Sequence, residues 1–247
     1  MKKYSRKGAL RMNNIQKTDN KITTYAERSL HLSLKTHFCP DASCHEVKLG
    51  RFVADACDGK TIFEIQTGNL KPLIKKLDYY IENTNYNIVV VHPLAKNRRL
   101  IWLDEDSGEL KKSTRLSPKH ESLCTGISEL YYVLDFLENE RVSFCFPLME
   151  IDEVRLLDGY GKAKKIRATS ADRLAGEIYS IEYVNSLRDV ERAILPLLPD
   201  EPFTRETLTK ALKLNRLKLW SAQKLLLEVG LLSSEKDGKR LIFRKRV

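Results

Sequence analysis

The chain has 247 residues, of which 42% are hydrophobic and 31% charged, and its formal net charge is +10. This length suffices for a sizeable core and predicts two domains. No apolar run approaches the roughly 18 residues of a membrane-spanning helix, which excludes a helical membrane protein. The basic N-terminus also lacks the apolar segment of a secretory signal. The five cysteines are scattered and odd in number, so we expect reduced thiols and a cytoplasmic protein.

The positive charge lies at the two ends of the chain. Residues 1–24 carry a net charge of +6 and residues 204–247 carry +8, which leaves −4 for residues 25–203. This asymmetry is typical of proteins that bind a polyanion. We therefore expect nucleic acid as the partner, foremost double-stranded DNA, and no membrane; a homodimer stays open. Residues 1–23 have no hydrophobic periodicity and are predicted to be a disordered basic tail.

A hairpin is predicted in residues 51–66, RFVADACDGKTIFEIQ, because Asp58-Gly59 between two alternating apolar runs is a strong hairpin signal. With Asp58 and Gly59 at the turn centre, the facing pairs are Arg51 with Gln66, Val53 with Glu64, and Asp55 with Ile62. One face then carries the core residues Phe52, Ala54, Phe63 and Ile65. The opposite face carries Asp55, Glu64 and Gln66.

Two carboxylates converge on the polar face of this predicted hairpin. Asp55 and Glu64 would be diagonal neighbours, roughly 7–8 Å apart between Cα atoms. Converging carboxylates repel each other, so one of them should have a raised pKa unless a cation joins them. Hard divalent ions such as Mg²⁺ prefer carboxylate oxygens. The alternative interpretation is a solvated polar face without a metal, and the pattern alone leaves both open.

Asp55 followed by Glu64-Ile65-Gln66 resembles the motif of the PD-(D/E)XK nuclease superfamily, in a variant in which Gln replaces the final Lys. The order of predicted elements from Thr24 to Leu103 is also similar: a helix with an acid, the hairpin, a helix and an apolar strand. The resemblance implies a restriction-endonuclease-like α/β fold, with a mixed central sheet flanked by helices, and metal-dependent cleavage of DNA phosphodiester bonds. The sequence departs from the motif in lacking a Pro before Asp55.

The resemblance also implies roles for single residues. Asp55, Glu64 and the backbone carbonyl of Ile65 would ligate Mg²⁺ or Mn²⁺, and Gln66 would orient the attacking water. Glu27 on the first helix would help to hold a metal-bound water, although its spacing from Thr24 also fits a plain helix cap. Gln66 lacks the positive charge of the usual Lys. Three lysines of the next helix therefore have three open readings, namely a solvated face, phosphate contacts, or a migrated lysine that supplies this charge: Lys71, Lys75 and Lys76.

Between the hairpin and the C-terminal region the periodicity predicts further elements. They are a helix over residues 70–81, strands over 87–91 and 99–103, a basic loop over 111–119, an amphipathic helix over 122–138, β-structure over 142–157 and a helix over 170–184.

The C-terminal region, residues 186–247, resembles a winged helix-turn-helix domain with three helices and a two-stranded wing. On the third helix, which Gly230 ends, one stripe is apolar and the opposite side is basic and aromatic. The residues predicted to contact DNA lie on this helix and on the wing: Arg216, Trp220, Lys224, Lys236, Lys239 and Arg240. A winged helix that binds a protein is the alternative.

The sequence as a whole predicts an endonuclease, in which residues 24–185 cut DNA and residues 186–247 hold it. Two alternatives remain. One is a non-catalytic DNA-binding regulator with a degenerate nuclease domain, which Gln66 favours and the intact Asp55 and Glu64 oppose. The other is an interaction module without nuclease chemistry.

Overall fold

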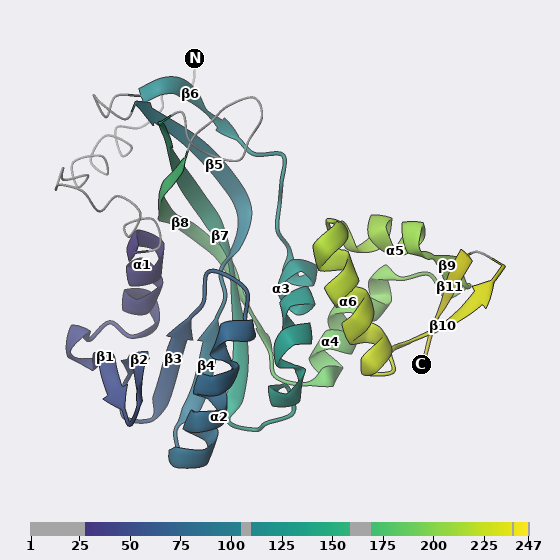
Figure 1. Ribbon diagram of the computed structural model, residues 1–247, viewed down its shortest axis with the longest axis horizontal. Coiled ribbons are helices and arrows are strands. Elements are labelled where there is room, and N and C mark those ends of the chain that lie inside the picture. Colours follow the sequence, from purple (N-terminus) through teal and green to yellow (C-terminus); the bar gives the residue numbers. More distant parts are fainter. Residues whose placement is uncertain (1–27, 105–109, 159–168, 239, 247) are drawn as a thin grey trace.

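The computed structural model describes residues 28–104, 110–158, 169–238 and 240–246 (Figure 1). The tail of residues 1–23, Glu27 and Lys239, to which the sequence analysis gave roles, lie outside the described residues. Within the described ranges, no helix combines the length and the apolar composition needed to cross a membrane.

A mixed sheet of eight strands forms the larger part of the molecule, with the strand order β1-β2-β3-β4-β7-β5-β6 and β8 paired to β7. The long strand β7 pairs in parallel with β4 along its first residues and with β5 further on. The strands are β1 (His45–Leu49), β2 (Phe52–Cys57), β3 (Thr61–Ile65), β4 (Asn87–Val91), β5 (Leu94–Asp104), β6 (Leu110–Leu116), β7 (Val142–Leu157) and β8 (Thr169–Val184). The strands predicted at 87–91 and 142–157 are confirmed as β4 and β7.

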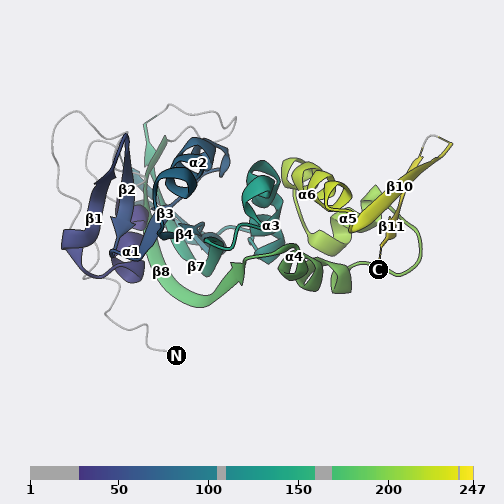
Figure 2. The ribbon, with the colours of Figure 1, turned by 90° about the horizontal axis from the view of Figure 1, so that it is seen from below.

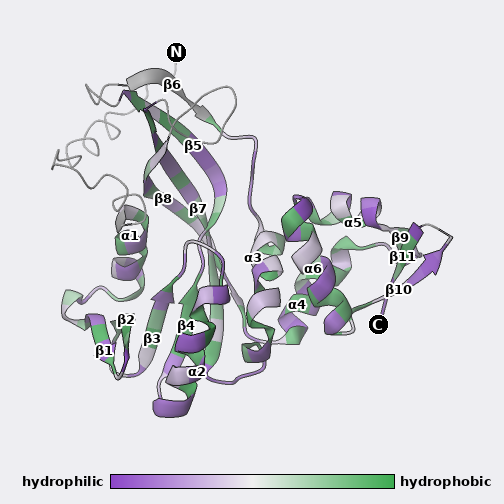
Figure 3. Cartoon of the chain, viewed as in Figure 1, coloured by the Kyte–Doolittle hydropathy of each residue, from purple (hydrophilic) through white to green (hydrophobic). Residues whose placement is uncertain are grey.

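Helices cover both faces of this sheet. Helix α1 (Arg28–Phe38) lies on one face, and α2 (Ile74–Asn83), which follows a short 3₁₀ helix at Lys71–Leu73, lies on the other (Figure 2). Strand β4 is hydrophobic along its length between them (Figure 3), as expected for a strand buried on both sides. The predicted coarse class, an α/β protein with a mixed central sheet flanked by helices, is confirmed.

The hairpin of β2 and β3 has a different register from the predicted one. Cys57 pairs with Ile62, whereas the sequence analysis paired Asp55 with that residue. The Asp58 carboxylate accepts the backbone N–H groups of Lys60 and Thr61 at 2.9 and 2.7 Å. Asp58 is therefore the first residue of the turn and Gly59-Lys60 its centre, because an aspartate side chain can take the place of a backbone acceptor.

The predicted core face of the hairpin is also wrong, because both faces of the sheet are covered. The Phe52 ring lies 5.4 Å from the Tyr79 ring of α2 between centroids. The Phe63 ring instead lies 6.2 Å from the Phe38 ring of α1. The two phenylalanines that were expected to share one face therefore point to opposite sides of the sheet.

Three further segments differ from their predictions. Residues 170–184 belong to β8 and not to a helix, since they complete the ladder along the free edge of β7. Gly176 fits this pairing, because a Cβ there would lie 2.5 Å from the Glu150 Cβ. Residues 111–116 belong to β6, paired with β5, and not to a loop. The helix predicted at 122–138 is α3 (Leu123–Leu130) followed by a 3₁₀ helix (Tyr131–Phe136).

The described part of the C-terminal region contains three α-helices, a 3₁₀ helix at Leu195–Leu197 and a small three-stranded sheet. In chain order its elements are α4 (Leu187–Ile194), β9 (Phe203–Thr204), α5 (Arg205–Leu212), α6 (Arg216–Glu228), β10 (Leu232–Asp237) and β11 (Arg240–Lys245). The Thr204 side chain caps α5, and the Asn215 side chain accepts two N–H groups at the start of α6. Gly230, with φ of +76°, follows α6, as the sequence predicted.

Helix α6 packs against α3, so the two parts of the chain share one hydrophobic core. Ile127 and Leu130 of α3 are fully buried in the same cluster as Leu225 and Leu226 of α6. The two helices lie side by side in both ribbon views (Figures 1 and 2). A hydrogen bond of 3.2 Å between the Tyr132 and Ser221 hydroxyls adds a polar contact beside this interface.

Candidate active site

The candidate active site lies where β2 and β3 separate. Beyond Ala56 the backbone pairing of β2 with β3 stops. The Asp55 carboxylate takes the next position, where its Oδ2 accepts the backbone N–H of Ile65 at 2.7 Å. The same Oδ2 lies 3.2 Å from Nε2 of His31 on α1. Two groups from different elements thus fix the orientation of Asp55.

Glu64 approaches the separation of the strands from the α2 face. Its side chain is 2% exposed. The Nζ atom of Lys76 lies 3.0 and 2.8 Å from its two oxygens, and the Tyr80 hydroxyl donates to Oε1 at 2.9 Å. Lys76 also donates to the Val53 carbonyl at 2.9 Å. Lys76 therefore connects Glu64 to the backbone of β2 just before Asp55.

The surroundings push the pKa values of the two carboxyl groups apart. Burial and the nearby charge of Asp55 raise the pKa of Glu64 to about 7, against the opposing effects of Lys76 and Tyr80. Burial also acts to raise the pKa of Asp55, but the hydrogen bond and charge of His31, with the Ile65 N–H, lower it below its usual value. The raised pKa that the sequence analysis expected for one acid thus falls on Glu64, and Asp55 is the ionised partner.

Gln66 does not join these residues. Its side-chain amide donates to the Asn69 carbonyl at 2.8 Å, and its own carbonyl accepts a hydrogen bond of 2.7 Å from Nδ1 of His92. The turn that follows β3 engages this side chain, and the role of the Gln66 amide in orienting an attacking water stays a prediction.

Two members of the cluster, His31 and Tyr80, were missed by the sequence analysis, and Lys76 was one of three lysines whose role was left open. Lys76 and Tyr80 are four residues apart on α2, a spacing that places both side chains on one face of a helix. The hydroxyl of Tyr80 in an otherwise apolar stripe was the available signal, since a buried hydroxyl needs a partner. His31 had no comparable signal in the sequence.

The donor set fits the Mg²⁺ that the resemblance implies. The Asp55 charge raises the pKa of Glu64, so the two carboxylates lie within each other's field, and a cation between them would remove this repulsion. Mg²⁺ commonly takes one or two carboxylates and completes its shell with water and substrate phosphates. In the described part of the chain, no three His, Cys, Asp or Glu side chains are grouped around one point.

The residues predicted to contact DNA on α6 point away from the protein core. Arg216 and Lys224 are exposed, and Trp220 is 43% exposed with its ring edge against Tyr131, at 5.3 Å between centroids. Lys236 and Arg240 on the strands of the wing are exposed as well.

Comparison with known proteins gives one match. No curated protein and no solved structure matches the chain. A family model described as a domain of unknown function, DUF8091, matches residues 28–185, which include the eight-stranded sheet and both carboxylates of the candidate site. Because this match covers more than half of the sequence, the chain belongs to the DUF8091 family.

Proposed function

We propose that the chain is a metal-dependent endonuclease that hydrolyses phosphodiester bonds in DNA, with its active site where β2 and β3 separate. The observation that carries the proposal is the cluster of Asp55, Glu64 and Lys76. It combines an ionised carboxylate, a buried carboxylate with a pKa of about 7 and a lysine ammonium. Strongly shifted and coupled carboxyl groups are concentrated at catalytic sites.

The order and pairing of the elements support the same proposal. One helix, three antiparallel strands, a second helix and a strand parallel to the third follow one another from α1 to β4. Apart from β1, which the sequence did not predict, this is the order of elements on which the resemblance to the PD-(D/E)XK superfamily rests. The restriction-endonuclease-like fold is thus part of the proposal.

Each residue of the cluster has a role in the proposed reaction. Asp55, Glu64 and the carbonyl of Ile65 would hold Mg²⁺ or Mn²⁺, which lowers the pKa of a bound water and neutralises charge on the scissile phosphate. Lys76 supplies the positive charge that Gln66 lacks, through its contact with Glu64. His31 holds Asp55 in its ionised form and fixed orientation.

The test of this function is digestion of a mixed panel of double-stranded DNA, single-stranded DNA and RNA by the full chain, with Mg²⁺, Mn²⁺ or EDTA. We expect DNA cleavage with either metal ion and none with EDTA. Absence of cleavage under every condition would contradict the proposal.

The C-terminal region is proposed to be a winged helix that binds the DNA. Its helices α4 to α6 and the strand order β10-β11-β9 support this assignment. The exposed Arg216 and Lys224 on α6 would contact phosphates or base edges in the major groove.

Replacing both Arg216 and Lys224 with Ala should weaken DNA binding by the full chain. Each lost phosphate contact should also reduce the slope of log K against log salt by about 1. Replacing Arg188 and Arg192 of α4, two other exposed arginines, is the matched control. Salt-dependent titrations of labelled duplex measure both pairs. Unchanged affinity and slope would indicate a winged helix that binds a protein.

A second candidate function is DNA binding without cleavage. Two observations favour it, since Lys76 already contacts both oxygens of Glu64 and Gln66 bonds to a turn. The panel above separates the two functions, because a regulator would bind duplex DNA and leave it intact with either metal ion.

A further inference from the structure

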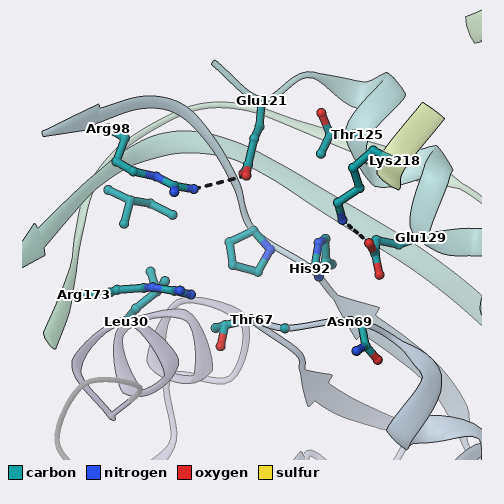
Figure 4. Close-up of a pocket in the computed structure, with 13 residues that line it drawn as sticks. Leu30, Thr67, Asn69, His92, Arg98, Glu121, Thr125, Glu129, Arg173 and Lys218 are labelled. Atoms are coloured by element: carbon teal, nitrogen blue, oxygen red, sulfur yellow. Dashed lines mark hydrogen bonds and ion pairs between the residues drawn. The ribbon is translucent and has the colours of Figure 1, made fainter. Parts of the chain in front are cut away.

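A cavity of about 300 Å³ lies between the carboxyl ends of β3 and β4, the long strands β5 and β7, and the helices α1, α3 and α6. Figure 4 shows its walls. Asp55, Glu64 and Lys76 do not line it, so it is distinct from the candidate active site. Its volume is in the range of small-ligand pockets.

One wall of the cavity holds a buried carboxylate with an unused oxygen. Glu129 of α3 is 3% exposed, and its Oε1 forms an ion pair with Lys218 of α6. Its Oε2 has no hydrogen-bond partner among the residues that the structure describes. A buried carboxylate oxygen left without a donor costs free energy. Glu129 Oε2 is therefore an acceptor for which the described residues provide no donor.

A second acceptor lies on the same wall. Nδ1 of His92 donates to the Gln66 carbonyl at 2.7 Å, and burial lowers the pKa of this imidazole. Burial thus favours the neutral imidazole, whose Nε2 is a hydrogen-bond acceptor when Nδ1 carries the proton. Glu129 and His92 together favour a ligand that carries N–H donors.

The opposite wall carries positive charge. Arg98 is already bound to Glu121, at 3.1 Å. Among the described residues, none forms an ion pair or a hydrogen bond with the Arg173 guanidinium. The Arg173 backbone N–H donates to Asp172 Oδ1 at 2.7 Å. Figure 4 shows Arg98 and Arg173 on one side of the cavity, and Glu129, Lys218 and His92 on the other. A guanidinium is well suited to a phosphate group.

We propose that this cavity binds a nucleotide, with an amino group of the base at Glu129 Oε2 and His92 and the phosphate at Arg173. Apolar side chains also line the cavity, among them Leu30, Pro93 and Ile151, and they offer contacts to the base or the sugar. The proposal does not depend on the nuclease activity.

Other occupants fit these walls less well. An α-amino acid carries its ammonium and α-carboxylate on the same carbon, so these two groups would lie together and not at opposite walls. Ordered water would satisfy Glu129 but leave Arg173 without an anion. A titration that gives no heat with any nucleotide would indicate water.

The test is calorimetric titration of the full chain with AMP, GMP, CMP and UMP, without divalent ions. UMP is the matched control ligand because uracil offers only the single N3–H donor, whereas an exocyclic amino group offers two N–H donors, one for each acceptor. We expect at least one of the other three to bind about tenfold more tightly than UMP, as is typical for a hydrogen bond to a charged group. No heat with any nucleotide at millimolar concentration would mean that the cavity holds only water.

Two substitutions place the ligand in the cavity. Glu129→Gln should remove the preference over UMP. Arg173→Met should lower the affinity for the nucleotide about tenfold and leave that for the corresponding nucleoside unchanged. Arg188→Met, an exposed residue of α4, is the control. The Arg173 variant keeps the test valid if Glu129→Gln does not fold. Affinities that neither variant changes would place the nucleotide elsewhere and overturn the proposal.

A competition experiment identifies the source of the nucleotide. If a short single-stranded oligonucleotide displaces the bound mononucleotide from the wild-type chain, the cavity takes one unit of a nucleic acid strand. If it does not, the ligand is a free nucleotide. Since no metal ion is present, failure of the endonuclease proposal would leave these results unaffected.

Discussion

Glu64→Gln should abolish cleavage, with a loss of about a thousandfold or more. The substitution keeps the shape of the side chain but removes a charged metal ligand, and metal-ion stabilisation of a transition state is worth several kcal/mol. It should also remove any rise in melting temperature on addition of Mg²⁺, because the ion would stabilise only the folded chain that binds it. DNA affinity should stay largely intact, since the basic residues of the C-terminal region are unchanged. Digestion, thermal unfolding and duplex titrations measure the three effects.

Other acids provide the comparison for this result. Asp55→Asn should have the same effect on cleavage. Asp58→Asn and Asp41→Asn should not abolish cleavage, because Asp58 caps the hairpin turn and Asp41 caps the 3₁₀ helix before β1. Cleavage that survives Glu64→Gln, or is lost with Asp41→Asn alone, would show that Asp55 and Glu64 are not the acids of the active site.

Lys76→Met should destabilise the protein at pH 8 and have little effect at pH 5. Burial raises the pKa of Glu64 from 4.5 to about 7, so the folded state binds this proton more tightly than the unfolded state. The free energy of unfolding therefore includes a contribution from protonated Glu64. This contribution is fully present below pH 4.5, the pKa of Glu64 in the unfolded chain, and is lost as the pH rises through about 7. Above that pH, Glu64 is charged and needs Lys76. We expect a cost of about 2 kcal/mol at pH 8, at the low end for a broken buried pair because Lys76 is partly exposed.

Urea unfolding at the two pH values measures this cost. Lys75→Met is the matched control, since Lys75 is the exposed neighbour on the same helix. In a Glu64→Gln background, Lys76→Met should cost little at either pH, because no buried charge remains to be paired. Cleavage by Lys76→Met should fall about a hundredfold, as for the loss of one electrostatic contact to a reacting group. A pH-independent loss of stability would show that Lys76 acts through packing alone.

The sequence predicted the elements whose structure depends on local patterns. A continuous apolar run defined β4, and Gly230 marked the end of α6. The two acids of the candidate site were also found, because they stand out in an alternating pattern. The hairpin register failed because a single side chain, Asp58, replaced a backbone group in the turn.

The rest depended on partners distant in the sequence. The face of each hairpin residue could not be assigned without knowing that helices cover both sides of the sheet. Residues 170–184 adopt a strand because β7 offers a free edge for pairing. The local propensity of these residues carries no information about that edge. The contact of His31 with Asp55 joins residues that only the packing of α1 on the sheet brings together.

The core shared by α3 and α6 means that the unit defined by sequence relatedness and the unit that folds are not the same. The family match ends at residue 185, yet Ile127 and Leu130 of α3 are buried in one cluster with Leu225 and Leu226. A chain cut at that residue would leave the apolar side of α3 in water. A relative with a different C-terminal region must therefore cover this helix by other means, or carry polar residues there.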